Sequence, residues 1–161
     1  MDMIAWDENL ATGVKEIDDE HMELIECYNR LSGEYMSGSK HNDVNELLRS
    51  LVAHTKSHFQ HEEALMDKAA YPAAASHKEE HHVLLQSVSM ILNRTGSEEH
   101  RPLGNYSLSF LRSWLVNHIL DADKELARFL LRPVQSQASE VAPLPAEVVT
   151  NPGNWSETHF I

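Results

Sequence analysis

The sequence predicts an all-α protein: an up-down-up-down four-helix bundle with an irregular N-terminal arm and a C-terminal tail. Three observations lead to this fold. Apolar residues recur every three or four positions in four long segments, as on the buried face of a helix. No segment alternates between apolar and polar residues as a β-strand does, and the connections between the four segments are short. With 161 residues, 42% of them hydrophobic, the chain is long enough to bury a core of its own.

The first two helices are expected on either side of the polar break GSKHND. The first runs from about Asp19 to Met36, with Asp18 as its N-cap. The second opens on Asp43, with a glutamate three residues later as in a capping box, and ends near Ala69. Both carry apolar residues at helical spacing on one face.

The third and fourth helices are bounded by prolines. Pro72 can occupy the first position of the third helix, where its missing N–H is not needed. That helix continues toward Arg94 and a polar run that ends it. The fourth helix spans about residues 103–132, and Pro133 stops it because proline cannot continue a helix.

Two irregular pieces belong to our domain assignment. We assign residues 1–132 to the bundle domain, including the arm at 1–17, whose Trp6 is expected to fold back onto the helices. The tail at 133–161 holds four of the six prolines and no helical periodicity. Its last eight residues include three large apolar side chains, so we expect it to pack along the bundle or to bind a partner: Trp155, Phe160 and Ile161.

Composition argues against two classes of partner. The net charge of −12, from 25 acidic and 13 basic residues, repels nucleic-acid phosphates and anionic membrane surfaces. No apolar run approaches the roughly 20 residues of a membrane-spanning helix, and the N-terminus lacks the pattern of a signal peptide. Cys27 is the only cysteine, which excludes an internal disulfide and fits a reducing compartment. We therefore expect a cytoplasmic protein.

The eleven histidines form a pattern that points to metal binding. Residues four apart lie on one face of a helix, and two predicted helices carry such pairs. A lone histidine on a helix is more often a core or rim residue than a ligand, but the joint pattern is harder to explain in that way. Seven converging groups suit two metal ions in the core of a bundle. The candidates are His58 with Glu62, His77 with His81, His21, and His118 with Asp121 or Asp123.

Four segments give the chain a resemblance to a known family. They are GVKEIDDEH (13–21), HFQHEEALM (58–66), YPAAASHKEEH (71–81) and WLVNHILDAD (114–123). Together they resemble the hemerythrins, in particular the single-domain bacterial members. The resemblance covers about residues 4–131, and the combination of motifs is highly specific.

The resemblance implies a non-haem centre of two iron ions per chain, joined by an oxo or hydroxo bridge. One iron would be held by His77, His81 and His118, and the other by His21 and His58. Glu62 and Asp123 would bridge the two. The iron with only two histidines would keep an open position, where members of the family bind O2 reversibly.

Helix geometry and the resemblance disagree over the fourth helix. Asp121 lies about 60° around an ideal helix from His118, whereas Asp123 lies about 140° away. The resemblance nevertheless selects Asp123. A π-turn between the two residues would bring an i,i+5 pair onto one face, and we predict that distortion.

The resemblance also implies an apolar O2 pocket lined by Phe59, Trp114, Leu115 and Ile119. Any bundle core contains such residues, so we expect them both to pack the core and to exclude water. Among the polar neighbours of the ligands, we expect His61 and Glu63 to be solvated. We keep open a supporting role for His54 beside the metal centre.

The predicted function is reversible O2 binding for transport, storage, delivery or sensing, without enzymatic turnover. Imidazole-rich sites suit Fe(II), whereas zinc usually accepts four ligands. Partners would be O2 and an oxygen-consuming enzyme or an electron donor, and we expect a monomer. Two alternatives stay open: a di-iron enzyme such as a peroxidase or a nitric-oxide-handling protein, and an interaction module that senses iron or oxygen.

Overall fold

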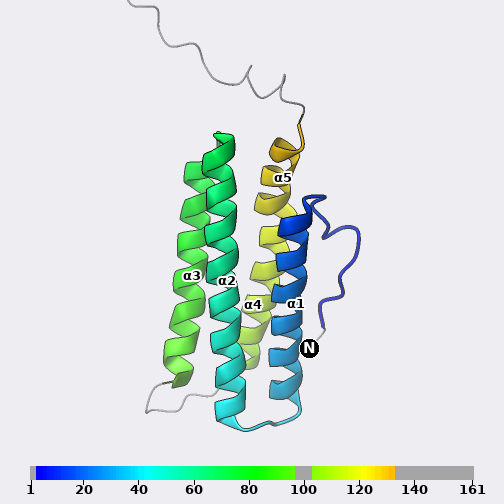
Figure 1. Cartoon of the computed structure of the whole chain (residues 1–161). Coiled ribbons are helices and arrows are strands. Elements are labelled where there is room, and N and C mark those ends of the chain that lie inside the picture. The colour runs from blue at the N-terminus through cyan, green and yellow to red at the C-terminus, as the bar shows by residue number, and fades with distance from the viewer. Residues whose placement is uncertain (1–2, 97–102, 133–161) are drawn as a thin grey trace, which may run out of the picture. The chain divides into compact units, whose positions relative to one another are not determined.

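A computed structural model describes residues 3–96 and 103–132. Within this part of the chain, all regular elements are helical, and consecutive long helices run antiparallel (Figure 1). Each helix packs against the next, and α1 also packs against α4, which closes the bundle. The predicted all-α, up-down-up-down bundle is confirmed. Its elements are α1 (Lys15–Met36), α2 (His41–Ala69), α3 (Ala74–Gly96), α4 (Asn105–His118), η1 (Ile119–Asp123) and α5 (Lys124–Leu130).

The predicted N-cap of the first helix is wrong. α1 begins at Lys15, and Asp18 lies inside its first turn. The Asp18 carboxylate instead accepts hydrogen bonds from the backbone N–H groups of Thr12, at 2.7 Å, and Gly13, at 3.1 Å. Gly13 has φ +85°, a left-handed conformation that glycine adopts without steric cost. The aspartate therefore holds the turn that leads into the helix.

The starts of α2 and α3 also differ from the prediction. α2 begins at His41 with no side-chain cap, so the expected capping box at Asp43 is not formed; that residue lies in the first turn, where its negative charge suits the helix dipole. α2 ends where Ala70 adopts the left-handed conformation, φ 51°, as helix C-termini often do. α3 then begins at Ala74, because Pro72 is used in the connecting turn.

The fourth predicted helix is interrupted by a π-helix. α4 ends at His118, η1 follows over five residues to Asp123, and α5 continues to Leu130. The predicted π-turn between the histidine and the aspartate is therefore confirmed. It is the one irregularity among the described parts of the long helices.

The core consists of two apolar clusters with a polar layer between them. The larger cluster includes Tyr28, Leu51 and Leu111, and the smaller one includes Met66 and Phe129; all five side chains are buried. Along each helix, the candidate metal ligands lie between residues of the larger cluster and residues of the smaller one. The apolar clusters thus seal the polar layer from both ends of the bundle.

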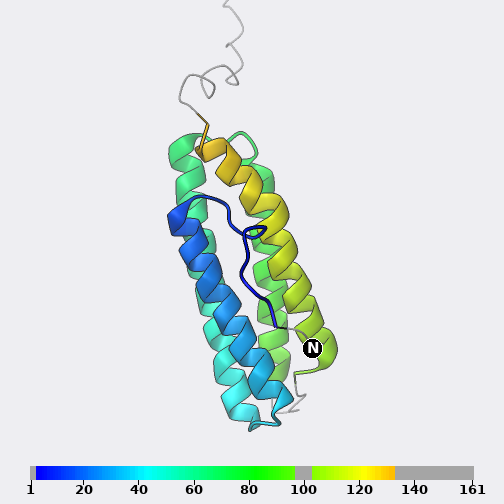
Figure 2. The same cartoon turned by 90° about the vertical axis from the view of Figure 1, so that its right-hand side faces the viewer.

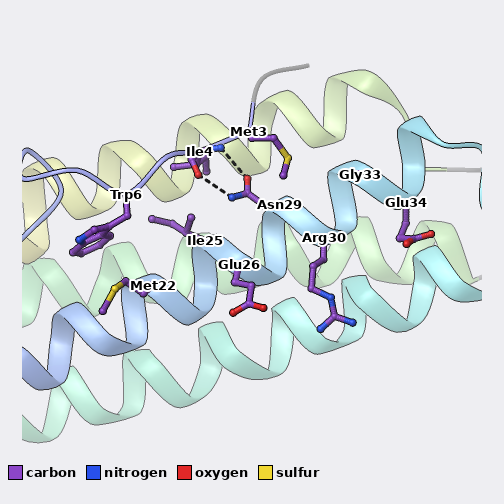
Figure 3. Close-up of a pocket in the computed structure, with 10 residues that line it drawn as sticks. All are labelled: Met3, Ile4, Trp6, Met22, Ile25, Glu26, Asn29, Arg30, Gly33 and Glu34. Carbon is purple, nitrogen blue, oxygen red and sulfur yellow. Dashed lines mark hydrogen bonds between the residues drawn. The ribbon is translucent and has the colours of Figure 1, made fainter.

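The N-terminal arm folds back onto the helices, as expected from Trp6. Ile4 and Leu10 are buried in the larger cluster, and Trp6 packs against it. Asn29 of α1 holds the arm with two hydrogen bonds of 2.8 Å, one to the N–H and one to the carbonyl of Ile4 (Figure 3). The arm lies across the face that α1 and α4 present (Figure 2). A surface groove beside it contains Met22 but none of the candidate metal ligands.

Two predictions concern the limits of the bundle. Residues 133–161 lie outside the described part, so the interpretation of the tail stays a prediction, as does the domain boundary at residue 132.

No helix in the described ranges is both long and apolar enough to span a bilayer.

Candidate metal centre

The predicted ligands converge in the polar layer. All seven side chains are buried, and those of His21, Glu62 and Asp123 are 0% exposed. They come from α1, α2, α3, α4 and η1. So many ionisable groups in a protein interior are costly unless a partner satisfies them. The arrangement therefore calls for one or more cations.

The seven residues form two clusters that share their carboxylates. One cluster contains three imidazoles and the other contains two, and in each the potential ligand atoms lie within 4.8 Å of one another. The three-histidine cluster is His77, His81 and His118 with Glu62 and Asp123, and the two-histidine cluster is His21 and His58 with the same Glu62 and Asp123.

Asp123 faces both clusters at once. Its Oδ2 atom lies 3.0 Å from Nε2 of His21. Its Oδ1 atom lies 3.1 Å from Nε2 of His77 and 3.2 Å from Nε2 of His118. One oxygen thus points to each cluster, as a carboxylate that bridges two cations would.

Glu62 is the second carboxylate that the two clusters share. Its Oε2 atom lies 3.3 Å from Nε2 of His81, 3.7 Å from Nε2 of His58 and 3.8 Å from Nε2 of His77. The side chain therefore also stands between imidazoles of both clusters. Asp121, the alternative to Asp123, is exposed.

Unpaired buried atoms show that the clusters fit cations. Among the described residues, Nε2 of His58, His81 and His118 and both carboxylate oxygens of Glu62 are buried without a hydrogen-bond partner. Native proteins leave few such atoms unpaired. Imidazole nitrogens and carboxylate oxygens are ligands that iron accepts, and two cations shared by these atoms would satisfy them.

The protonation of the three-histidine cluster suits this role. Burial, reinforced by the neighbouring His118 and His77, lowers the pKa of His81 to about 2. Burial likewise lowers the pKa of His118 to about 4. Both imidazoles are therefore neutral near pH 7, and a neutral imidazole is the form that binds a metal.

The surroundings shift the pKa values of the two carboxylates in opposite directions and raise the pKa of His58. Burial and the charge of Asp123 raise the pKa of Glu62 well above its usual range. Burial also disfavours the ionised form of Asp123, but hydrogen bonds from surrounding imidazoles outweigh it and hold its pKa well below normal. Burial would lower the pKa of His58, yet its acidic neighbours raise it to about 10. A cation bound at His58 would therefore displace a proton.

Comparison with known proteins agrees with this geometry. A family model described as the hemerythrin HHE cation binding domain matches residues 12–130. The chain belongs to the hemerythrin family. A bacteriohemerythrin from Pseudomonas aeruginosa is 33% identical over 120 residues, which are 74% of this chain and 76% of that protein. One from Stenotrophomonas maltophilia is 33% identical over 127 residues, 79% and 81% of the two chains.

Solved structures place the fold in the same family. The crystal structure of a wild-type hemerythrin is 28% identical and covers 80% of this chain and 98% of that one, with a TM-score of 0.74. The predicted hemerythrin resemblance is thus confirmed. The predicted ligands come together in this hemerythrin fold, while their coordination of iron stays a prediction.

Three glutamates lie outside the clusters beside ligand histidines, a placement that we did not predict; two of them make hydrogen bonds. Glu20 on α1 lies 2.9 Å from Nδ1 of His58, and Glu63 on α2 lies 3.1 Å from Nδ1 of His81. A third, on α3, has its carboxylate 3.9 Å from Nδ1 of the α4 ligand: Glu80 with His118. Each carboxylate therefore comes from the helix that precedes its histidine in the chain.

The side chain of Glu63 is 35% exposed, so it is partly solvated as predicted, but its carboxylate also contacts the ligand histidine His81. His61 is exposed, as predicted, but its Nδ1 also lies 2.7 Å from Glu20. His54 contacts its own helix, with Nδ1 2.8 Å from the carbonyl of Ser50. No described contact links His54 to the clusters. Each of the three glutamates stands next to a predicted ligand in the sequence, but that position does not reveal which histidine it reaches.

Two of the four predicted pocket residues, Phe59 and Trp114, form an aromatic wall beside the three-histidine cluster. Phe59 stacks on His81, with ring centroids 3.7 Å apart and planes at 7°. It also meets the edge of Trp114 at 6.3 Å. Leu115 and Ile119 are buried as well. That these residues exclude water from the clusters, and that they line an O2 pocket, both stay predictions.

Proposed function

We propose that this hemerythrin-family chain binds O2 reversibly at a non-haem di-iron centre, for oxygen transport, storage, delivery or sensing. The observation that carries the proposal is the pair of buried clusters with three and two imidazoles that share two carboxylates. His77, His81 and His118 would hold one iron, His21 and His58 the other, with Glu62 and Asp123 between them.

The number of ligand groups favours a pair of irons over zinc. Zinc sites in proteins are usually complete with four ligands, whereas the three-histidine cluster alone offers five groups. When bound, two ferrous ions supply the electrons that reversible O2 binding requires. The two-histidine cluster offers one imidazole fewer, which leaves room for an exogenous ligand.

The residues around the proposed di-iron centre favour reversible O2 binding over catalytic turnover. We propose that the protein is not an enzyme. Five imidazoles, neutral when they bind metal, and two carboxylates bring little negative charge, which stabilises highly oxidised iron less than a carboxylate-rich site does. Phe59 packs on His81 and against Trp114 beside the clusters; these aromatic rings would exclude water from that side, and water exclusion suppresses side reactions. We also propose a cytoplasmic location, because Cys27 is a free thiol and free thiols are usual in a reducing compartment. As partner we propose an oxygen-consuming enzyme or an electron donor.

An anaerobic optical titration tests the proposal. The ferrous protein is titrated with O2 and then purged with argon, and the metal content is measured on the same sample. Two irons per chain and a visible charge-transfer band that appears with O2 and disappears under argon are expected. Irreversible conversion to a ferric form would favour an enzyme or a sensor. Zinc, or no metal after reconstitution, would contradict the di-iron assignment.

A further inference from the structure

One glutamate on α1 contacts two histidines on α2. Glu20 lies 2.9 Å from Nδ1 of His58 through Oε2 and 2.7 Å from Nδ1 of His61 through Oε1. The two histidines are three residues apart and therefore lie on the same side of α2. A single carboxylate thus uses both of its oxygens to bridge the gap between two helices.

This contact determines which nitrogen of His58 faces the clusters. In the neutral ring that binds a metal, Nδ1 donates its hydrogen to the carboxylate of Glu20 and Nε2 keeps its lone pair free. Nε2 is buried and lies 3.7 Å from Glu62 Oε2 and 4.0 Å from Asp123 Oδ2. The outer hydrogen bond therefore fixes both the ring orientation and the tautomer that a metal ligand requires.

Orientation matters most in the cluster with fewer imidazoles. The two-histidine cluster contains only His21 and His58, and Nδ1 of His21 has no hydrogen-bond partner among the described residues. The three-histidine cluster instead has two outer carboxylates, Glu63 and Glu80, near its histidines. The smaller cluster thus depends on one such contact.

We propose that Glu20 is a positioning residue that sets the affinity of the two-histidine cluster for its metal ion, and that His61 holds Glu20 in place. The inference rests on the proposed metal centre but not on O2 binding. The side chain of Glu20 is 26% exposed and that of His61 is 48% exposed. Their truncation opens no cavity in the core, so the bundle should keep its fold.

The test is a titration of metal-free protein with Co²⁺, in which visible absorption and calorimetry measure the binding. The wild type should bind two equivalents. Glu20→Ala should weaken one equivalent about 10- to 100-fold and leave the other unchanged, the range usual for such outer contacts. His61→Ala should weaken the same equivalent less. Glu23→Ala removes an exposed glutamate from the same helix and should change neither.

A double variant shows whether Glu20 acts through His58. If it does, Glu20→Ala should add nothing in a His58→Ala background, because the interaction is already lost. Glu20→Gln keeps an oxygen that can accept from Nδ1 and should restore part of the affinity. It also carries the test if Glu20→Ala folds poorly.

The outcomes separate this inference from the proposed function. A wild type that binds no cobalt refutes the metal centre itself. A wild type with two equivalents and a Glu20→Ala variant that matches it refutes only the role of Glu20. Equal weakening of both equivalents, or a further loss in the His58→Ala background, would mean that Glu20 acts through the fold, and would also overturn the inference.

Discussion

Asp123 follows His118 by five residues, yet its Oδ1 atom lies 3.2 Å from Nε2 of that histidine. In an uninterrupted α-helix the two side chains would point about 140° apart. The π-helix η1 begins directly after His118 and ends at Asp123, so the extra residue in the turn rotates the aspartate back toward the histidine. A local departure from regular helix geometry, of a kind often found at functional sites, thus completes both clusters.

This relationship predicts opposite outcomes for the two aspartates of the segment. Asp123→Asn should reduce the binding of both metal ions, because its two oxygens face different clusters. Asp121→Asn should leave two metals per chain, since Asp121 is exposed. Metal content after anaerobic reconstitution measures both. Loss of metal in the Asp121 variant with retention in the Asp123 variant would reverse our assignment.

Metal removal should lower the stability of the bundle. A ligand that binds only the folded state adds about 2.7 kcal/mol per site at a concentration 100 times its Kd, which for two sites raises Tm on the order of 10 °C in a domain of this size. Thermal unfolding followed by circular dichroism, with and without Fe²⁺ under anaerobic conditions, measures the shift. The variant His58→Ala/His81→Ala loses one imidazole from each cluster, so Fe²⁺ should raise its Tm little. Equal Tm values for metal-free and metal-loaded wild type would contradict the site.

The arm should depend on Asn29. Asn29→Ala removes two hydrogen bonds to Ile4 and should cost about 1–3 kcal/mol, as two hydrogen bonds of ordinary net strength would. Urea unfolding measures the free energy, and hydrogen exchange at the Ile4 amide reports whether the arm detaches. Asn93→Ala, an exposed asparagine on α3, is the control. Unchanged exchange at Ile4 would mean that apolar packing alone holds the arm.

The sequence predicts the parts of the structure that follow from spacing along one helix. The pairs His58 with Glu62 and His77 with His81 lie four residues apart, and each pair contributes to a cluster. Apolar periodicity likewise located all four long helices. Asp123 needed the family resemblance in addition, because regular geometry favours the wrong residue.

Contacts between helices were not predictable in the same way. Whether Glu20 reaches His58 depends on the rotation and separation of α1 and α2, which no spacing within either helix reveals. The helix starts failed for a related reason. Asp18 has the chemistry of an N-cap, but its carboxylate binds Thr12 and Gly13 in the preceding turn, and the arm that forms this turn is placed by packing against the bundle.

The last prediction concerns the lifetime of the oxygenated protein and rests on Leu115, a buried residue next to Trp114 in the chain. Leu115→Ala should speed autoxidation, because a cavity beside the clusters admits water. A buried Leu→Ala change also destabilises a protein by about 2–5 kcal/mol wherever it occurs. Leu31→Ala is therefore the matched control, since Leu31 is fully buried and lies far along α1 from His21. Decay of the oxygenated absorption band at fixed temperature and pH measures the rate. Faster decay in Leu115→Ala alone supports water exclusion beside the clusters, whereas equal acceleration in both variants assigns the effect to general loosening of the bundle.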